Sequence, residues 1–149
     1  MSTRLHLAGA EDLARLMPLT RAFCAEVGIE TDDDFRREAL TPLLEGCPHG
    51  AIYLIGPQRA PVGYIILSFG WSLEFGGMDG FVDELYIRPA VRGRGMASDV
   101  LYSLPKALKE AGLKALHLEV LRDDPAAQGL YRKAHFDTRD NYMLMSRKL

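Results

Sequence analysis

The sequence predicts an α/β fold with a mixed, mostly antiparallel sheet of six to seven strands and about four helices. Apolar residues recur at helical spacing in the first third and again after residue 92, and short apolar runs separated by turn residues lie between them. The length of 149 residues, with 48% hydrophobic and 26% charged residues, is typical of one ordinary globular domain. We therefore expect a single domain over residues 1–149, and the composition excludes wholesale disorder and fibrous repeats.

The expected elements follow from the periodicity and from the turn residues between them. Thr31 is a candidate N-cap for the second helix, and Pro42 is expected to break that helix near its end. Gly112 is a good terminator for the third helix. Asp124 followed by Pro125 predicts the N-cap and first residue of a short fourth helix. The expected strands are 3–8, 51–55, 62–69, 81–87, 115–121 and 142–147, and the expected helices are 13–27, 32–45, 93–112 and 125–134.

The composition also limits the compartment and the cofactors. No apolar run approaches the roughly 20 residues that a membrane span needs, and the first residues lack the apolar stretch of a signal peptide. Cys24 and Cys47 are too few for a disulfide framework or a four-ligand zinc site. We therefore expect a cytoplasmic protein that binds neither a metal nor a membrane.

The net charge of −2 hides an uneven distribution along the chain. Residues 88–149 carry 12 Lys and Arg against 7 Asp and Glu, a net +5, whereas residues 1–87 carry a net −7. The near-neutral total argues against nucleic-acid binding. Two explanations stay open: an ordinary fluctuation of surface charge, or two partners of opposite charge.

One short segment combines glycine and arginine between a predicted strand and a predicted helix. It reads Arg92-Gly93-Arg94-Gly95-Met96-Ala97. Backbone N–H groups at a helix N-terminus can bind an anion, the glycines let the main chain approach it closely, and the arginines add positive charge. The patterns G-K-[ST] of a nucleotide P-loop and G-x-G-x-x-G of a dinucleotide fold do not occur here. The alternative is a glycine-rich turn with exposed arginines.

This segment resembles the signature [QR]-x-x-G-x-[GA] of the GNAT superfamily of acyl-CoA-dependent N-acetyltransferases. Arg92, Gly95 and Ala97 match the signature directly. A second block of the family has a strand, an Asn, an Ala and then Leu-Tyr before Gly-Phe, and residues 118–136 are similar to it. The two blocks occur in the right order on the right elements, and the resemblance covers residues 62–136 well.

The resemblance implies acetyl-CoA as a co-substrate, with no metal. The backbone of 85–87 would pair with the pantetheine arm as an added strand, and the amides of 93–98 would hold the pyrophosphate. The residues that the resemblance assigns to coenzyme A are Leu85, Tyr86, Ile87, Arg92, Gly93, Arg94, Gly95, Met96, Ala97, Ser98 and Asp124.

The resemblance also implies that Tyr131 is the general acid that protonates the departing thiolate. A phenol of pKa about 10 can donate this proton, and such a transfer contributes about 10²–10⁴-fold to the rate. Two positions depart from the family pattern. Asp124 replaces the family Asn, so the helix cap should survive while an amide contact to coenzyme A is in question. His135 replaces a family Gly, and a positive φ is expected there.

The general base is expected among the acidic residues of the strand over 81–87. Asp83 and Glu84 are both candidates, and strict alternation points them to opposite faces of the strand. The same alternation puts Val82, Glu84 and Tyr86 on one face. Glu119 matches a glutamate used by some protein N-terminal acetyltransferases of the family and ranks third.

The expected acceptor is a primary amine on a cationic small molecule such as a polyamine or an aminoglycoside, which would attack directly in a ternary complex. Trp71, Phe75 and Phe23 could flank such a substrate. A peptide or protein N-terminus or a lysine is the alternative acceptor, and a non-catalytic acyl-CoA-binding regulatory module is the alternative of another class. Many family members dimerise, which leaves a homodimer open. The acidic residues that favour a cation are Glu26, Glu30, Asp32, Asp33, Asp34, Glu74, Asp79, Asp83 and Glu84.

Overall fold

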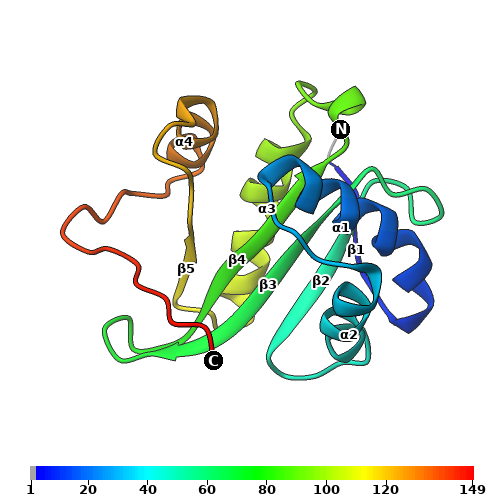
Figure 1. Cartoon of the computed structure of the whole chain (residues 1–149). Coiled ribbons are helices and arrows are strands. Elements are labelled where there is room, and N and C mark those ends of the chain that lie inside the picture. Colours follow the sequence, from blue (N-terminus) through cyan, green and yellow to red (C-terminus); the bar gives the residue numbers. More distant parts are fainter. Residues whose placement is uncertain (1–2) are drawn as a thin grey trace. The chain divides into compact units, whose positions relative to one another are not determined.

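The computed structural model describes residues 3–149 and contains two compact units, Met1–Glu119 and Val120–Leu149. The first unit holds the sheet and the helices α1, α2 and α3, and the second unit holds the helix α4 (Figure 1). Apart from Asp124, the residues expected from the sequence to bind coenzyme A lie in the first unit, as do the candidate general bases. The predicted general acid lies in the second.

The first unit is built on a five-stranded sheet in the order β1-β2-β3-β4-β5. The pairs from β1 to β4 are antiparallel, and β5 is parallel to β4. The parallel pair requires a crossover connection, which α3 provides. The strands are β1 (Leu5–Leu7), β2 (Gly50–Ile55), β3 (Gly63–Ser72), β4 (Gly77–Ile87) and β5 (Ala115–Leu118).

Helices cover both faces of this sheet (Figure 1). One cluster of buried residues joins α1 and α2 to Tyr64 and Tyr86. The other joins α3 to Val82 and Ile87 on the opposite face. The helices are α1 (Leu13–Val27), α2 (Asp33–Leu44) and α3 (Met96–Glu110), with short 3-10 helices η1 (Ala10–Asp12) and η2 (Pro89–Val91).

The prediction of six to seven strands is wrong, because the described residues contain five. The expected strand over 142–147 does not form. Its residues 142–145 are a continuous apolar run without alternation, and they are 61–84% exposed. A strand needs a partner for its backbone groups, and an apolar run alone does not supply one.

The predicted break at Pro42 is also wrong, because α2 runs through this residue to Leu44. Leu40 and Leu44 are buried against the sheet on either side of the proline. Their burial keeps the last turn helical despite the backbone hydrogen bond that proline cannot make.

Candidate active site

Strand β4 carries a β-bulge where the sequence places its two acidic residues. Leu67 of β3 pairs with Val82, and the preceding Ile66 pairs with Glu84, so Asp83 is one extra residue in β4. The bulge shifts the side-chain alternation. Val82 packs in the cluster under α3, whereas Tyr86 packs in the cluster under α1 and α2. The prediction that Val82, Glu84 and Tyr86 share one face is therefore wrong, and alternation no longer separates Asp83 from Glu84.

Glu84 is held by a hydroxyl from the neighbouring strand. Tyr64 is fully buried in β3, and its hydroxyl donates a 2.7 Å hydrogen bond to Glu84 Oε1. Burial raises the pKa of Tyr64 strongly, so the hydroxyl keeps its proton and remains a donor. Burial also raises the pKa of Glu84, and the charge of Asp83 raises it further, while the Tyr64 hydrogen bond opposes both effects. Its raised pKa makes Glu84 a weaker acid, and its carboxylate a stronger base, than an exposed glutamate.

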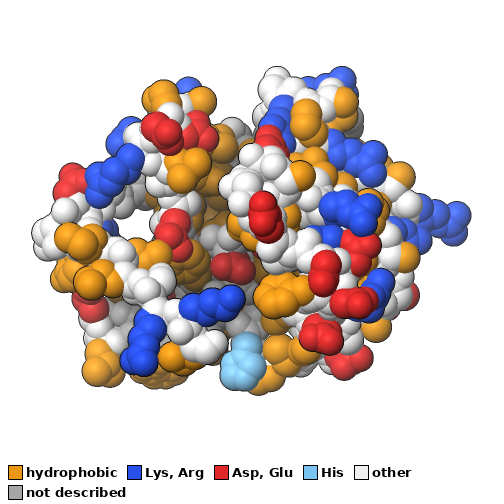
Figure 2. Space-filling view, viewed as in Figure 1, with side chains coloured by type: hydrophobic (Ala, Val, Ile, Leu, Met, Phe, Trp, Pro, Cys, Tyr) orange, Lys and Arg blue, Asp and Glu red, His pale blue; other side chains and the backbone are white. Residues whose placement is uncertain are grey.

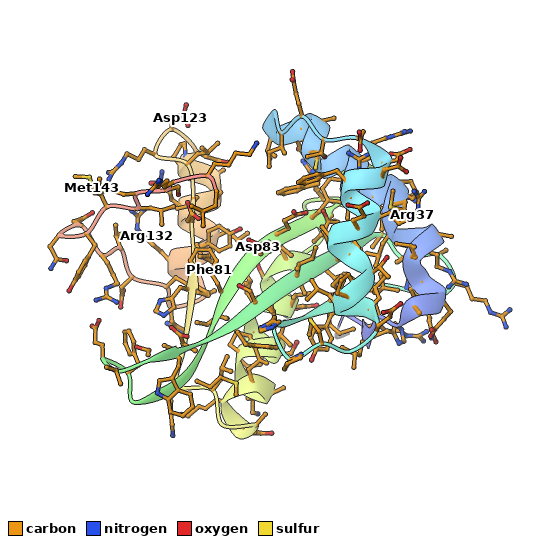
Figure 3. All side chains as sticks on the ribbon, turned by 60° about the horizontal axis from the view of Figure 1, so that its bottom comes forward. Arg37, Phe81, Asp83, Asp123, Arg132 and Met143 are labelled. Carbon is orange, nitrogen blue, oxygen red and sulfur yellow. The ribbon has the colours of Figure 1, made fainter. Side chains whose placement is uncertain are left out.

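The sheet forks just beyond the bulge. The register between β4 and β5 ends at Val82 and Leu118, so among the described residues 84–87 are paired with β3 alone. This free edge contains the segment Leu85–Ile87 that was predicted to bind the pantetheine arm. Figure 3 shows Phe81 and Asp83 along β4 on either side of the end of the paired segment, well away from Arg37 on α2.

The turn before α3 has the backbone geometry of an anion cradle. Gly93 and Gly95 have φ of 79° and 81°, a region that glycine enters at little cost. Gly95 is the N-cap of α3 and has no side-chain cap, so the first amides of the helix lack a partner within the helix. A Cβ at either glycine would meet no heavy atom within 4 Å, so the space beside the turn is open at both positions. The predicted residues Met96, Ala97 and Ser98 form the first turn.

Arg92 braces this turn through its side chain. Its guanidinium makes a bidentate pair with Glu26 of α1 at 2.6 and 2.7 Å, and its Nε donates to the Ile87 carbonyl at 2.7 Å. It also lies 5.6 Å from the ring centroid of Tyr86. The hydrogen bond from Arg92 lowers the pKa of Glu26. The sequence could not indicate this clamp, since its two residues lie 66 positions apart. Arg94 is exposed beside it.

The second unit has the local geometry that its sequence predicts. The helix α4 (Pro125–Lys133) begins after Asp124, whose carboxylate accepts from the Ala127 amide at 3.0 Å, so the predicted cap is confirmed. His135 has φ of 72°, so the positive φ expected where the family pattern has glycine is confirmed. Tyr131 packs edge-on against Phe136, and its partial burial raises its pKa, with the charge of Asp124 adding to this.

Three of the nine acidic residues expected to attract an amine, Glu26, Asp33 and Asp34, form salt bridges with arginines. Asp33 pairs with Arg21 and Arg36, and Asp34 pairs with Arg37. Acidic and basic side chains therefore alternate over α1 and α2 (Figure 2). An open cavity of about 780 Å³ lies here, away from the fork. Its lining includes Arg21, Cys24, Glu30, Thr31, Asp34 and Arg36.

Phe23 is half-buried, and its ring packs edge-on against Tyr64 and Tyr86. Trp71 is 73% exposed, and Phe75 packs near His117. Glu119, the third candidate base, is exposed just after the end of β5.

Residues 3–149 also bear on membrane and metal binding. None of the described helices has the length and apolar composition that crossing a bilayer requires. The same residues contain no group of three or more His, Cys, Asp or Glu placed to hold a metal ion.

Known proteins share this fold. Acetyltransferase YE1169 of Yersinia enterocolitica is 36% identical over 75 residues, which cover 48% of this chain and 53% of that protein. The chain thus spans about half the length of that relative. The integron cassette protein HFX_CASS3, from the mobile metagenome of Cole Harbour Salt Marsh, is 33% identical with a TM-score of 0.83, over 97% of this chain and 90% of that chain. AAC(6')-Iy, solved with the bisubstrate analog CoA-S-monomethyl-acetylneamine, has a TM-score of 0.80 over the whole of both chains. Its identity of 12% shows the fold alone.

A sequence model of one family covers most of the chain and both of its motif blocks. The Acetyltransferase (GNAT) family model matches residues 15–136. The match includes the fork of the sheet, the turn before α3 and the helix α4 with Tyr131. The chain belongs to the GNAT family of acetyltransferases.

Proposed function

We propose that this chain transfers an acetyl group from acetyl-CoA to a primary amine by direct attack in a ternary complex. The observation that carries the proposal is the placement, within one compact unit, of an open strand edge at 83–87 and an uncapped helix N-terminus at Gly95. Family membership supports the same function. An extended thiol arm and a pyrophosphate are the two parts of coenzyme A that such an edge and such a helix terminus recognise.

The backbone of the turn before α3 supports a binding site for the pyrophosphate of coenzyme A. The positive φ of Gly93 and Gly95 and the empty space around them let phosphate oxygens approach the amides of 95–98. The clamp between Arg92 and Glu26 holds the turn in place, since Arg92 also bonds to the end of β4. In this proposal Arg92 acts by position, while Arg94 contributes charge.

The chemistry needs one proton removed and one supplied. Glu84 takes the proton that the attacking amine loses, directly or through one water, and its raised pKa makes it a better base than an ordinary carboxylate. The nitrogen forms a bond to the thioester carbonyl carbon while the bond from that carbon to sulfur breaks. Tyr131 donates its proton to the departing thiolate, and its raised pKa keeps the phenol protonated until that moment. Asp83, next to Glu84, adds negative charge that favours a cationic amine.

We infer a cationic small molecule as the acceptor. Asp83 and Glu84 at the bulge support it, since among the described residues neither forms a salt bridge, whereas Asp33 and Asp34 are paired with arginines. AAC(6')-Iy, solved with an analog of an acetylated neamine, shows that this fold can serve an amino sugar. Its identity is too low to transfer that substrate here.

The proposal is tested by measuring thiol release from acetyl-CoA over a panel of small cationic amines and peptides with free N-termini. Turnover with small amines, lost in Tyr131→Phe, is the expected result. Turnover with peptides alone would make the chain a peptide acetyltransferase. Coenzyme A binding without turnover on any acceptor would leave the regulatory module as the function.

A further inference from the structure

A histidine and an aspartate on β4 and β5 form a pair that the proposed reaction does not use. His117 Nε2 lies 3.1 Å from Asp79 Oδ2, and the two side chains are 27% and 21% exposed. The ring of Phe75 lies 5.5 Å from the imidazole and limits its movement. Gly70 on β3 sits opposite Asp79, where a Cβ would lie 3.1 Å from Asp79 Oδ1, so the glycine leaves room for the carboxylate.

The pair lies close to the fork of the sheet. His117 is in register with Phe81, one residue before the last pair between Val82 and Leu118. At about 3.3 Å per residue, the level of His117 is about 7 Å from Asp83 along β4. The fork at which the amine is proposed to react is therefore within reach of a small acceptor bound at His117.

The pair faces away from α3. A Cβ on Gly80 would contact Leu113 and Leu116, and Val82 packs in the cluster under α3, so these two residues mark that face of β4. Asp79 and Phe81 alternate with them and lie on the other face. Glu84 also lies on that face, since it bonds to Tyr64 in the cluster under α1 and α2. The histidine pair and the proposed base therefore share one face of the strand.

The chemistry of the pair suits a cation. The Asp79 carboxylate only accepts hydrogen bonds, so Nε2 of His117 donates to it. In the neutral tautomer that makes this bond, Nδ1 has a lone pair and the pair as a whole carries a net negative charge. Among the described residues Asp79 forms no ion pair with Lys or Arg, in contrast to Asp33 and Asp34. A lone pair and an uncompensated charge, both partly shielded from solvent, together favour an ammonium group.

We propose that His117 and Asp79 bind a second amino group of the acceptor, so that diamines are preferred over monoamines of the same length. This inference rests on the proposed function, because the first amino group is the one acetylated at the fork. His117 accepts a hydrogen bond from the distal ammonium at Nδ1, and Asp79 orients the imidazole and supplies the charge. The pair selects the acceptor and takes no part in the bond changes.

The test compares linear diamines of increasing length with the matching monoamines in acetyl transfer. Asp79→Asn keeps the shape and removes the charge, and His117→Phe keeps the ring packing and removes the lone pair. Both variants should raise the KM for the preferred diamine about tenfold or more, because each loses one hydrogen bond or charge contact to the distal ammonium. Neither variant should change kcat for monoamines. Glu45→Gln is the matched control, because it removes one negative charge at the exposed end of α2. It should change neither the preference for diamines nor kcat.

The result that overturns the proposal is an equal loss for diamines and monoamines, or no loss for either. Calorimetric binding of a diamine in the presence of coenzyme A provides a reading that needs no turnover. Wild-type protein should bind it about tenfold more tightly than Asp79→Asn, and equal affinities would also refute the subsite. Turnover of monoamines by the wild type tests the proposed function separately.

Discussion

Removing the hydroxyl of Tyr64 should raise the pKa of Glu84 by about one unit. The Tyr64→Phe variant keeps the buried ring and deletes the 2.7 Å hydrogen bond that favours the ionised carboxylate. A hydrogen bond to a charged group is worth about 1.5–3 kcal/mol. The lower end applies, because Glu84 is partly exposed, and about 1.4 kcal/mol corresponds to one pKa unit.

The assay is the pH dependence of kcat/KM for an amine acceptor, which reports the base in the free enzyme. The acidic limb should move up by about one unit in Tyr64→Phe. Tyr53→Phe, which removes the hydroxyl of a half-buried tyrosine on β2, is the matched control and should leave the limb in place. An unshifted limb, or a shift to lower pH, would refute the assignment of Glu84 as the base held by Tyr64.

The pH dependence of the free energy of unfolding of Tyr64→Phe is a second test, and the direction of the change can be predicted. Since the folded pKa of Glu84 is raised above its ordinary value of 4.5, its contribution to stability is present below that pH and is lost as pH rises through the folded pKa. At a pH above both the ordinary and the folded pKa of Glu84, the variant also leaves the ionised carboxylate without its hydrogen-bond donor. Urea unfolding should therefore show a loss of about 1.5 kcal/mol at neutral pH and a smaller loss in acid. An equal loss at both would mean that the hydroxyl does not favour the ionised form.

Three further predictions concern the other parts of the site. Gly95→Ala should lower the free energy of unfolding by about 1 kcal/mol, because alanine disfavours a positive φ, and should weaken acetyl-CoA binding. Gly46→Ala is the control: with φ of 92° in equally open space, it should lower stability by the same amount and leave acetyl-CoA binding unchanged. Tyr131→Phe should lower kcat by about 10²-fold or more at unchanged acetyl-CoA affinity, and the exposed Tyr142→Phe should change neither; a loss within about threefold would remove Tyr131 as the acid. His135→Gly should stabilise the chain by about 1 kcal/mol in thermal unfolding by relieving the left-handed backbone, and a lower Tm would contradict this.

Local chemistry made much of this structure predictable. Asp124 followed by Pro125 fixes the start of α4 through side-chain and φ preferences that act within one turn. Gly95 precedes α3 for the same kind of reason. The positive φ at His135 could be expected because relatives carry glycine there.

Features that depend on register or on distant pairing could not be predicted. The bulge at Asp83 reverses the alternation of β4, and this one-residue shift depends on the pairing with β3, which the local sequence pattern does not specify. The pairing of Arg92 with Glu26 and of Asp33 with Arg21 depends on how α1 packs, so the acidic bias of the first half overstated the free negative charge. An apolar run at 142–145 predicted a strand, although strand formation requires a partner that the run itself does not specify.

The most direct test of acetyl transfer follows an isotope-labelled acetyl group from acetyl-CoA by NMR in the presence of a cationic amine. The label should appear as an amide on the acceptor nitrogen, with one free thiol released per amide formed and no label left on the protein. Label appearing only as free acetate, or retained on a side chain such as that of Cys24, would contradict direct transfer to an amine.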